Sequence, residues 1–144
     1  MNPEYEYKFY DDKACFNFVE HEFPEYYDAY VNLPQNVERS DFFRILVVLR
    51  KGGVYADMDA GCVKPIDTFI SPTDALVVGW ENECATDERA YSRHFARKRQ
   101  ITNWVFAGAP GHPALREMAN HVREHANAPV SYTHLTLPTR DVGG

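Results

Sequence analysis

The residues best suited to chemistry are two aspartates in a D-x-D pattern, Asp57 and Asp59, which follow the Gly-Gly-Val-Tyr segment Gly52–Tyr55. If the chain is extended here, Tyr55, Asp57 and Asp59 point to one side, because side chains alternate along a strand. Two carboxylates aimed together repel each other unless a cation or a donor group lies between them. Mg²⁺ and Mn²⁺ prefer such oxygen ligands and keep coordination positions open for phosphate. The pattern therefore predicts a site for a divalent metal and a phosphate; the alternative is a surface turn with two solvated aspartates.

A second pair of charged residues, Asp41 and Arg44, lies upstream of the D-x-D. Residues three apart share one face of a helix, and Lys51 falls near the same stripe. The opposite face carries the apolar residues Ile45, Leu46 and Leu49. Taken alone, the charged pair could be a solvated ion pair worth only about 0.3 kcal/mol. The D-x-D strand that follows favours a ligand-binding role for Asp41 and Arg44.

A helix and a short strand would position these residues. We expect a helix over 41–51, with Ser40 as its N-cap and Gly52-Gly53 as its stop, and then a strand over 54–57. Ligands gather at the carboxyl ends of strands in open α/β sheets, which is where the D-x-D lies. Apolar periodicity, aspartates and prolines predict further helices at about 11–20, 24–31 and 113–125, and strands at 5–10, 75–80 and 101–107. This alternation of strands and helices predicts an α/β layer fold.

Composition narrows the class of protein. The chain has 144 residues, 44% of them hydrophobic, which suits one folded domain. Its net charge of -6 argues against a nucleic-acid partner but not against a nucleotide, since a bound metal supplies local positive charge. The three cysteines show no C-x-x-C spacing, so we expect buried or half-buried thiols rather than disulfides or a zinc site. No apolar stretch is long enough to span a membrane.

Two other kinds of D-x-D site can be compared with this one. An EF-hand loop starting at Asp57 requires Glu at its twelfth position, where this chain has Thr68. A phosphatase with an aspartyl nucleophile usually continues with a small hydroxyl residue, whereas Ala60-Gly61 follows here. A Mg²⁺-dependent phosphohydrolase that uses Asp57 remains the alternative enzyme class.

The two motifs together resemble the sugar-binding D-x-D region of glycosyltransferase family 32, which includes mannosyltransferases and enzymes of capsular polysaccharide synthesis. The likeness rests on Arg39-Ser40-Asp41-x-x-Arg44 and on Gly52-Gly53-Val54-Tyr55-x-Asp57-x-Asp59. Shorter matches are Asn2–Lys8, Asp11-Asp12, Lys64-Pro65-Ile66, Asn103 and His112-Pro113. The resemblance runs from about Asn2 to about Ala128.

The resemblance implies a GT-A fold, a Rossmann-like nucleotide-sugar transferase core. It also implies a metal-dependent, retaining transfer of a hexose from a UDP- or GDP-sugar to a glycan or lipid-linked acceptor. By the same resemblance, Asp41 and Arg44 would grip hydroxyls of the donor sugar, and Tyr55 would lie near the ribose. Asp57 would contact ribose and sugar, and Asp59 would ligate Mn²⁺ or Mg²⁺, so that Asp57 and Asp59 are the expected catalytic residues. A non-catalytic sugar-binding remnant is the other alternative.

Family members begin earlier and run further, so we expect residues 1–129 to form a partial catalytic domain, incomplete at the ends. Residues 130–144 resemble the translation of a sequencing adapter, which predicts a non-native tail. This favours a bacterial, cytoplasmic protein, or a Golgi lumenal one if the source is eukaryotic and an N-terminal anchor has been lost.

Other residues carry further predictions. Arg89, Arg93 and Arg97 would form a basic stripe if helical, most simply a solvated face. Trp80 is expected in the core. His112 is expected to cap a helix, and Asn103 is expected to make a polar contact to an acceptor.

Overall fold

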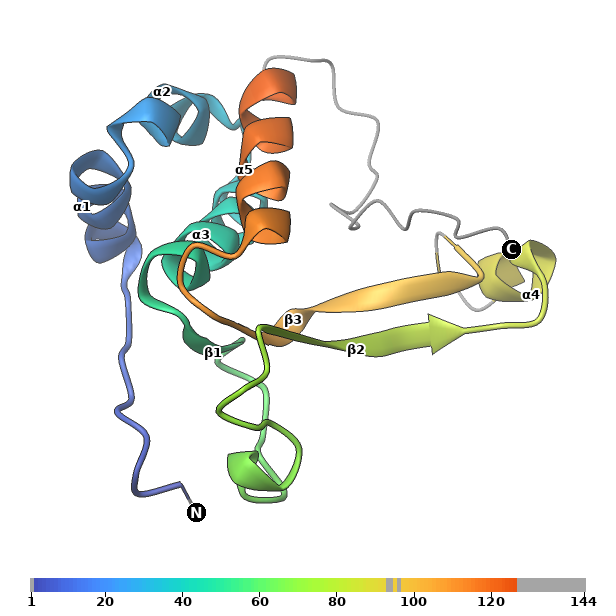
Figure 1. Cartoon of the computed structure of the whole chain (residues 1–144). Coiled ribbons are helices and arrows are strands. Elements are labelled where there is room, and N and C mark those ends of the chain that lie inside the picture. Colours follow the sequence, from blue (N-terminus) through green and yellow to red (C-terminus); the bar gives the residue numbers. More distant parts are fainter. Residues whose placement is uncertain (1, 93–94, 96, 127–144) are drawn as a thin grey trace.

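The computed structural model describes residues 2–92, 95 and 97–126 and has a mixed α/β architecture (Figure 1). This confirms the predicted fold class. In chain order the elements are α1 (Asp12–Glu22), α2 (Pro24–Asn32), α3 (Asn36–Lys51), β1 (Gly53–Ala56), the 3-10 turn η1 (Ile66–Thr68), β2 (Leu76–Glu83), α4 (Asp87–Ser92), β3 (Arg99–Gly108) and α5 (Pro113–His125).

Helix α3 is the centre of the core. Its apolar residues are buried almost all round, as expected of a helix covered on several sides: Phe42, Phe43, Ile45, Leu46, Val48 and Leu49. The helix begins earlier than predicted, because Gln35 and Glu38 form a capping box just after Pro34. Ser40 is therefore not the N-cap but a residue inside the helix. The predicted stop at Gly52 is confirmed.

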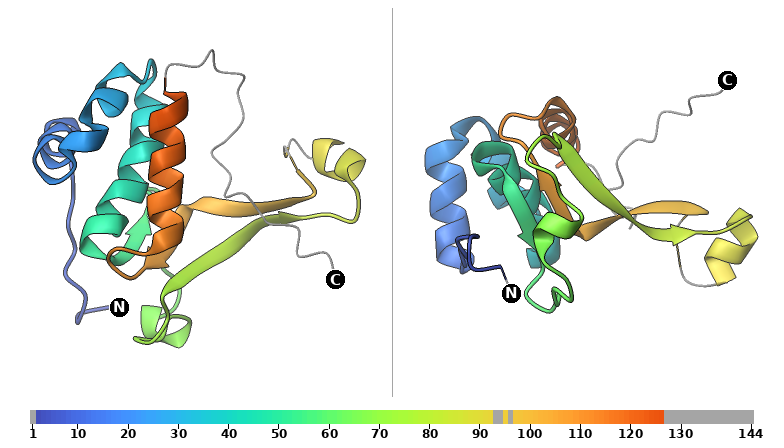
Figure 2. Two further views of the ribbon diagram at one scale, coloured as in Figure 1. Left: turned by 45° about the horizontal axis from the view of Figure 1, so that its top comes forward. Right: turned by 60° about the horizontal axis from the view of Figure 1, so that its bottom comes forward.

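Helices α1, α2 and α5 surround α3 (Figure 2). Their predicted starts are confirmed: the Asp11 side chain accepts from the Ala14 backbone N–H, and Pro24 and Pro113 open their helices. Val19, Phe23 and Tyr26 meet Phe42 and Leu46 in one hydrophobic cluster. The strand predicted over 5–10 is wrong, since this segment is irregular and Tyr5, Tyr7 and Phe9 are exposed. Alternation was misleading there because no neighbouring strand pairs with the segment.

The sheet is small and antiparallel, in the order β1-β3-β2. Its β1 end packs on α3, while β2 and β3 extend together away from the helices towards α4 (Figures 1 and 2). Strand β2 was predicted to be buried, but most of it is exposed because little packs on the faces of β2 and β3 where they extend beyond the helices. Trp80 is consequently 56% exposed, which overturns its predicted place in the core.

Strand β3 carries an irregularity beside the helices. Val78 pairs with Phe106, but Trp80 pairs with Ile101, so the ladder with β2 skips residues 102–105. Such bulges bend a strand and redirect its side chains and carbonyls, and they are over-represented next to functional sites. Here the bulge lies directly opposite the D-x-D strand, because Asp57 N–H donates to the carbonyl of Trp104, 2.9 Å away.

Gly52 joins α3 to β1 in a conformation that requires glycine. Its φ is 67°, and a Cβ there would lie 2.6 Å from Cδ of Pro110. Gly52→Ala should therefore destabilise the fold by about 2–3 kcal/mol, through backbone strain and this clash. Gly53→Ala, with positive φ but open space, should cost about 1 kcal/mol, and Gly61→Ala almost nothing. Urea unfolding of the three variants checks this order, and equal losses at Gly52 and Gly61 would contradict it.

The remaining predictions concern peripheral features. Helix α4 ends at Ser92, so Arg97 lies outside it and no helical stripe joins Arg89 to Arg97; Arg93 lies outside the described residues. The predicted tail 130–144 also lies outside them. Cys15 and Cys84 are half-buried, as expected, but Cys62 is exposed; all three are free. No described helix has the length and apolarity needed to cross a membrane.

Candidate functional site

Arg44 is the centre of the candidate site. Its Nη2 lies 2.8 Å from Oδ1 of Asp41 and 3.6 Å from Oδ1 of Asp57. Its Nη1 donates to the carbonyl oxygen of Asn103 at 2.8 Å, and its guanidinium lies over the Tyr55 ring, 5.3 Å from the centroid. Arg44 thus joins helix α3, the end of strand β1 and the bulge of strand β3.

The Asp41–Arg44 pair is not the solvated pair that was the simpler alternative. The two side chains are only 17% and 8% exposed. Both sit on α3 one turn apart, and the bulge of β3 covers Arg44 from the other side. Lys51, expected near the same stripe, instead pairs with Glu22. The cation that separates the carboxylates of Asp41 and Asp57 is therefore the protein's own guanidinium.

Tyr55 and Asp57 point to one side, as predicted from alternation. The Tyr55 hydroxyl donates to Oδ1 of Asp57 at 2.7 Å. Burial, and then this hydrogen bond, raise the pKa of Tyr55 above its ordinary value of 10.0. Because one carboxylate oxygen of Asp57 faces both Tyr55 and Arg44, its orientation is fixed by the protein.

Asp59 is placed differently. Strand β1 ends at Ala56, and the Ala60 N–H donates to the Asp57 carbonyl in a turn. The extended geometry behind the prediction therefore holds for Tyr55 and Asp57 but does not reach Asp59, whose side chain is exposed. Asp59 therefore carries a solvent-exposed carboxylate, whereas the nearby carboxylate of Asp57 is half-buried and held in place by Tyr55 and Arg44.

The side chains present can be compared with the ligands that the expected metal requires. The described part of the chain contains no group of three or more His, Cys, Asp or Glu side chains that could hold an ion. Magnesium-like ions, however, are often bound by one or two carboxylates together with substrate phosphates and water. The exposed carboxylate of Asp59 therefore suits a hard divalent ion that takes its other ligands from phosphate and water, and not an ion caged by protein alone.

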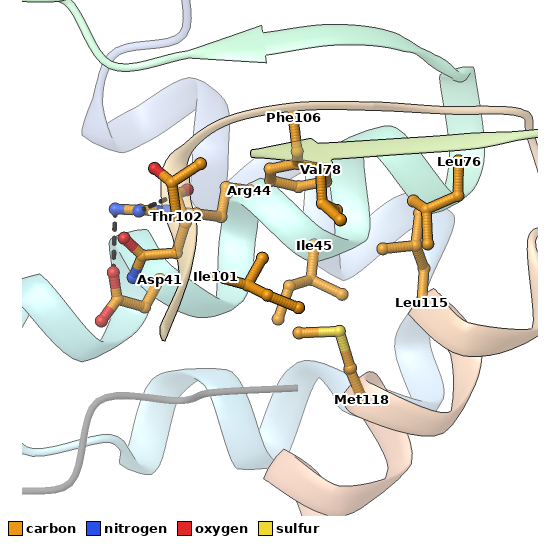
Figure 3. A pocket seen from close by; sticks show the side chains of 11 residues that line it. Asp41, Arg44, Ile45, Leu76, Val78, Ile101, Thr102, Phe106, Leu115 and Met118 are labelled. Carbon is orange, nitrogen blue, oxygen red and sulfur yellow. Dashed lines mark hydrogen bonds and ion pairs between the residues drawn. The ribbon is translucent and has the colours of Figure 1, made fainter. Parts of the chain in front are cut away.

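Asp41, Arg44, Tyr55, Asp57 and Asn103 form the Arg44 cluster. A pocket of about 40 Å³ adjoins this cluster, between α3, α5 and strands β2 and β3 (Figure 3). Asp41, Arg44 and Thr102 gather at one end, Leu115 and Met118 lie at the other, and Ile101 lies between them (Figure 3). Such a combination of an apolar wall with a few convergent polar groups is typical of ligand sites.

Other candidate residues fall partly inside this site. Asn103 is there, since it lines the pocket and its carbonyl accepts from Arg44. His112 is the N-cap of α5, accepting from the Ala114 N–H, as predicted. The sequence reasoning missed Thr102 and Trp104, because the register of β3 that brings them to the site depends on the bulge.

Tyr55→Phe should show what the phenol contributes. Losing its hydrogen bond to Asp57 should lower the free energy of unfolding by about 1–2 kcal/mol at pH 8. Since the folded pKa is raised above the unfolded value near 10, this contribution is complete below about pH 10 and is lost as pH rises further. The difference between wild type and variant should therefore shrink by pH 11 in urea unfolding experiments. Tyr7→Phe, at an exposed position, is the control, and an equally large effect there would refute the assignment.

Comparison with known proteins gives one family match and several relatives. The sequence profile described as "Glycosyltransferase sugar-binding region containing DXD motif" matches residues 1–76, which include every member of the cluster except Asn103. No solved structure matches the chain significantly.

Three fungal proteins are among the relatives. The chain is 33% identical over 129 residues to the initiation-specific alpha-1,6-mannosyltransferase of Candida albicans, covering 81% of this chain and 33% of that protein. It is 34% identical over 131 residues to the putative glycosyltransferase HOC1 of Saccharomyces cerevisiae, covering 85% and 33%. Inositol phosphoceramide mannosyltransferase 3 of Schizosaccharomyces pombe is 25% identical over 126 residues, covering 88% and 31%. The chain thus spans about a third of the length of these relatives.

Because the profile covers more than half of the 144 residues and contains both motifs of the Arg44 cluster, the chain belongs to the glycosyltransferases with a sugar-binding region containing the DXD motif, family 32.

Proposed function

We propose that this protein is a hexosyltransferase that moves mannose from a nucleoside diphosphate sugar to a glycan or lipid-linked acceptor. The observation that carries the proposal is the Arg44 cluster, in which Asp41, Tyr55 and Asp57 meet beside the exposed Asp59. A half-buried, pre-arranged set of polar groups suits the recognition of sugar hydroxyls, and a free carboxylate next to it suits a metal-bound diphosphate.

Each residue of the site has one role in binding the donor. Asp41 and Arg44 hold hydroxyls of the donor sugar, and Tyr55 lies towards the ribose while fixing the orientation of Asp57. The second oxygen of Asp57 faces the donor, and Asp59 holds Mn²⁺ or Mg²⁺. When bound, the metal would stabilise negative charge on the diphosphate leaving group. We assign retention of configuration and a GT-A architecture to the whole enzyme on the family's pattern.

The choice of mannose rests on the relatives. Those from Candida albicans and Schizosaccharomyces pombe are named mannosyltransferases, and one acts on inositol phosphoceramide by name. The carboxylates of Asp41, Asp57 and Asp59 outnumber the single guanidinium of Arg44, so a bound divalent metal would have to offset this negative charge as well as that of the diphosphate.

The test is turnover with labelled donors. The chain is incubated with Mn²⁺, a short mannose-containing acceptor, and in turn GDP-mannose, UDP-glucose, UDP-galactose or UDP-N-acetylglucosamine. We expect labelled product from GDP-mannose, and none after chelation with EDTA. Release of phosphate from p-nitrophenyl phosphate, without sugar transfer, would instead identify a phosphohydrolase. Donor binding without turnover would identify a sugar-binding remnant.

A further inference from the structure

Trp104 is an exposed tryptophan opposite the end of the D-x-D strand. Its carbonyl accepts from the Asp57 N–H at 2.9 Å, and the next residue, Val105, pairs with Ala56 of β1. The Trp104 side chain is 43% exposed, and among the described residues no ring packs on it and no group accepts from its indole N–H. Single exposed aromatic residues are common on protein surfaces, so the informative feature of Trp104 is its position beside the Arg44 cluster.

The register of β1 and β3 places the Trp104 side chain beside that of Asp57. Tyr55 pairs with Phe106, and their rings lie on one face of the sheet with centroids 5.7 Å apart. Asp57 shares this face, because its carboxylate accepts from the Tyr55 hydroxyl. The backbone hydrogen bond from Asp57 to Trp104 continues the same ladder. Opposed side chains of antiparallel strands lie on one face with Cβ atoms about 5 Å apart, so the indole borders the Asp57 carboxylate.

The position of Trp104 is set by its backbone and not by contacts of its ring. The carbonyl of Asn103, the preceding residue, accepts from Arg44 at 2.8 Å. The ladder with β2 skips residues 102–105, so Trp104 has no paired residue on that strand. The backbone is therefore held by α3 and β1 while the indole stays open to solvent. This leaves an aromatic surface in a fixed place beside the polar cluster.

An aromatic ring beside a carboxylate suits a sugar ring as its ligand. The C–H groups on one face of a pyranose pack on the negative face of an aromatic ring, while its hydroxyls bond to polar groups at the edge. The Asp57 side chain is 31% exposed, so a ligand that reaches it from solvent also meets the indole. The polar neighbours Asn103 and Asp57 favour such a ligand over an apolar chain.

Two sugars must meet at this point, the donor hexose and the acceptor. In the proposed function, Asp41 and Arg44 approach from α3 and hold the donor through its hydroxyls. Trp104 approaches Asp57 from β3, which extends away from the helices (Figure 1). Its indole offers one hydrogen-bond donor and no acceptor, so it holds a ring without selecting most of its hydroxyls. That is the property expected of a contact to an acceptor saccharide.

We propose that Trp104 binds the acceptor, by stacking against the hexose that receives the transferred sugar. The inference rests on the proposed function, because it takes the sugar at Asp41 and Arg44 to be the donor. It assigns the acceptor side of the site to a residue outside both sequence motifs. Reacting atoms must approach to about 3.5 Å, and an acceptor ring on Trp104 lies next to a donor sugar at Asp57.

The kinetic experiment compares Trp104→Leu, which removes the ring, with Trp104→Phe, which keeps a smaller one. Each is assayed on the whole 144-residue chain with GDP-mannose, Mn²⁺ and α-linked mannobiose as the acceptor. Trp104→Leu should raise the KM for mannobiose at least about tenfold, and Trp104→Phe about threefold. The dissociation constant for GDP-mannose should stay within about twofold, and the melting temperature should barely change because the side chain is exposed. Trp80→Leu, at the other exposed tryptophan, should alter none of these quantities.

A fluorescence titration tests the contact without turnover. The chain has two tryptophans, so in the Trp80→Phe variant the emission comes from Trp104 alone. Mannobiose, added in the presence of GDP and Mn²⁺, should change this emission saturably. Mannitol, which carries hydroxyls but no ring, should not change it.

The outcomes separate this inference from the proposed function. Sugar transfer with an unchanged KM for mannobiose in Trp104→Leu would overturn the inference and leave the transferase proposal intact. A loss confined to the affinity for GDP-mannose or GDP would also overturn it, because the ring would then hold the donor sugar or the base. If no nucleotide sugar supports transfer, the proposed function fails; a saturable response of Trp104 to mannobiose would still support a saccharide site, and no response would refute both.

Discussion

Arg44→Met should be the most damaging single substitution in the candidate site, lowering the free energy of unfolding by about 3–5 kcal/mol and removing measurable donor binding. The guanidinium is the counter-charge for the half-buried carboxylates of Asp41 and Asp57 and the donor to the Asn103 carbonyl. Methionine fills much of the volume but leaves Asp41 without its counter-ion in a site only 17% exposed. Urea unfolding at pH 7 measures the loss.

Controls separate this effect from a general loss of charge. Arg50→Met lies on the same helix, but its ion pair with Glu22 is about 40% exposed; because Arg50 also donates to the Glu22 carbonyl and lies over the Phe23 ring, the change should cost about 1–2 kcal/mol. The double variant Asp41→Leu with Arg44→Met should recover part of the stability, because the uncompensated carboxylate is gone, but it should not recover donor binding. A loss at Arg44 no greater than that at Arg50 would refute the central role of Arg44.

Asp59→Asn should have the opposite profile: binding of GDP-mannose in the presence of Mn²⁺ should weaken by at least about 100-fold, with almost no change in stability. Asp59 is exposed in the turn after β1, so the amide disrupts no buried contact. It does remove the negative charge that a hard divalent cation needs from its ligand. Isothermal titration calorimetry with and without Mn²⁺ should show wild-type affinity falling to that of the variant when the metal is removed.

An exposed aspartate away from the site provides the matched control. Asp28→Asn on α2 changes the net charge by the same amount as Asp59→Asn and should leave donor affinity within about twofold of wild type. If Asp59→Asn binds donor and metal as tightly as Asp28→Asn does, Asp59 is not the metal ligand.

Most helix ends were predictable from sequence because their signals are local, whereas the start of α3 was missed because its capping box uses Gln35 in place of the usual Ser, Thr, Asp or Asn. Asp11, Pro24, Pro113 and the Gly52 stop each act within one turn of the helix that they begin or end. Burial along the sheet was not predictable in this way. Trp80 was expected in the core because it ends an apolar run, but β2 leaves the helices before reaching it, and that path is decided by tertiary packing.

The candidate site likewise combines contacts set by local spacing with contacts set by tertiary packing. Asp41 with Arg44, and Tyr55 with Asp57, meet through helical and strand periodicity, so spacing alone brought them together. The bulge in β3 brings the Asn103 carbonyl to Arg44. The burial of Arg44, and its position between the carboxylates of Asp41 and Asp57, depend on this bulge. Thr102 escaped notice for the same reason, since a lone threonine in a strand carries no signal until the register of β3 is known.

The most direct test of the central claim, that a metal-bound nucleotide sugar occupies the Arg44 cluster, is X-ray diffraction at the manganese absorption edge from crystals grown with Mn²⁺ and GDP-mannose. The account predicts one anomalous peak within bonding distance of the Asp59 carboxylate, about 2.2 Å, with the diphosphate on its far side and the hexose against Asp41 and Arg44. A manganese peak elsewhere, or a nucleotide bound with Asp59 free in solvent, would contradict it.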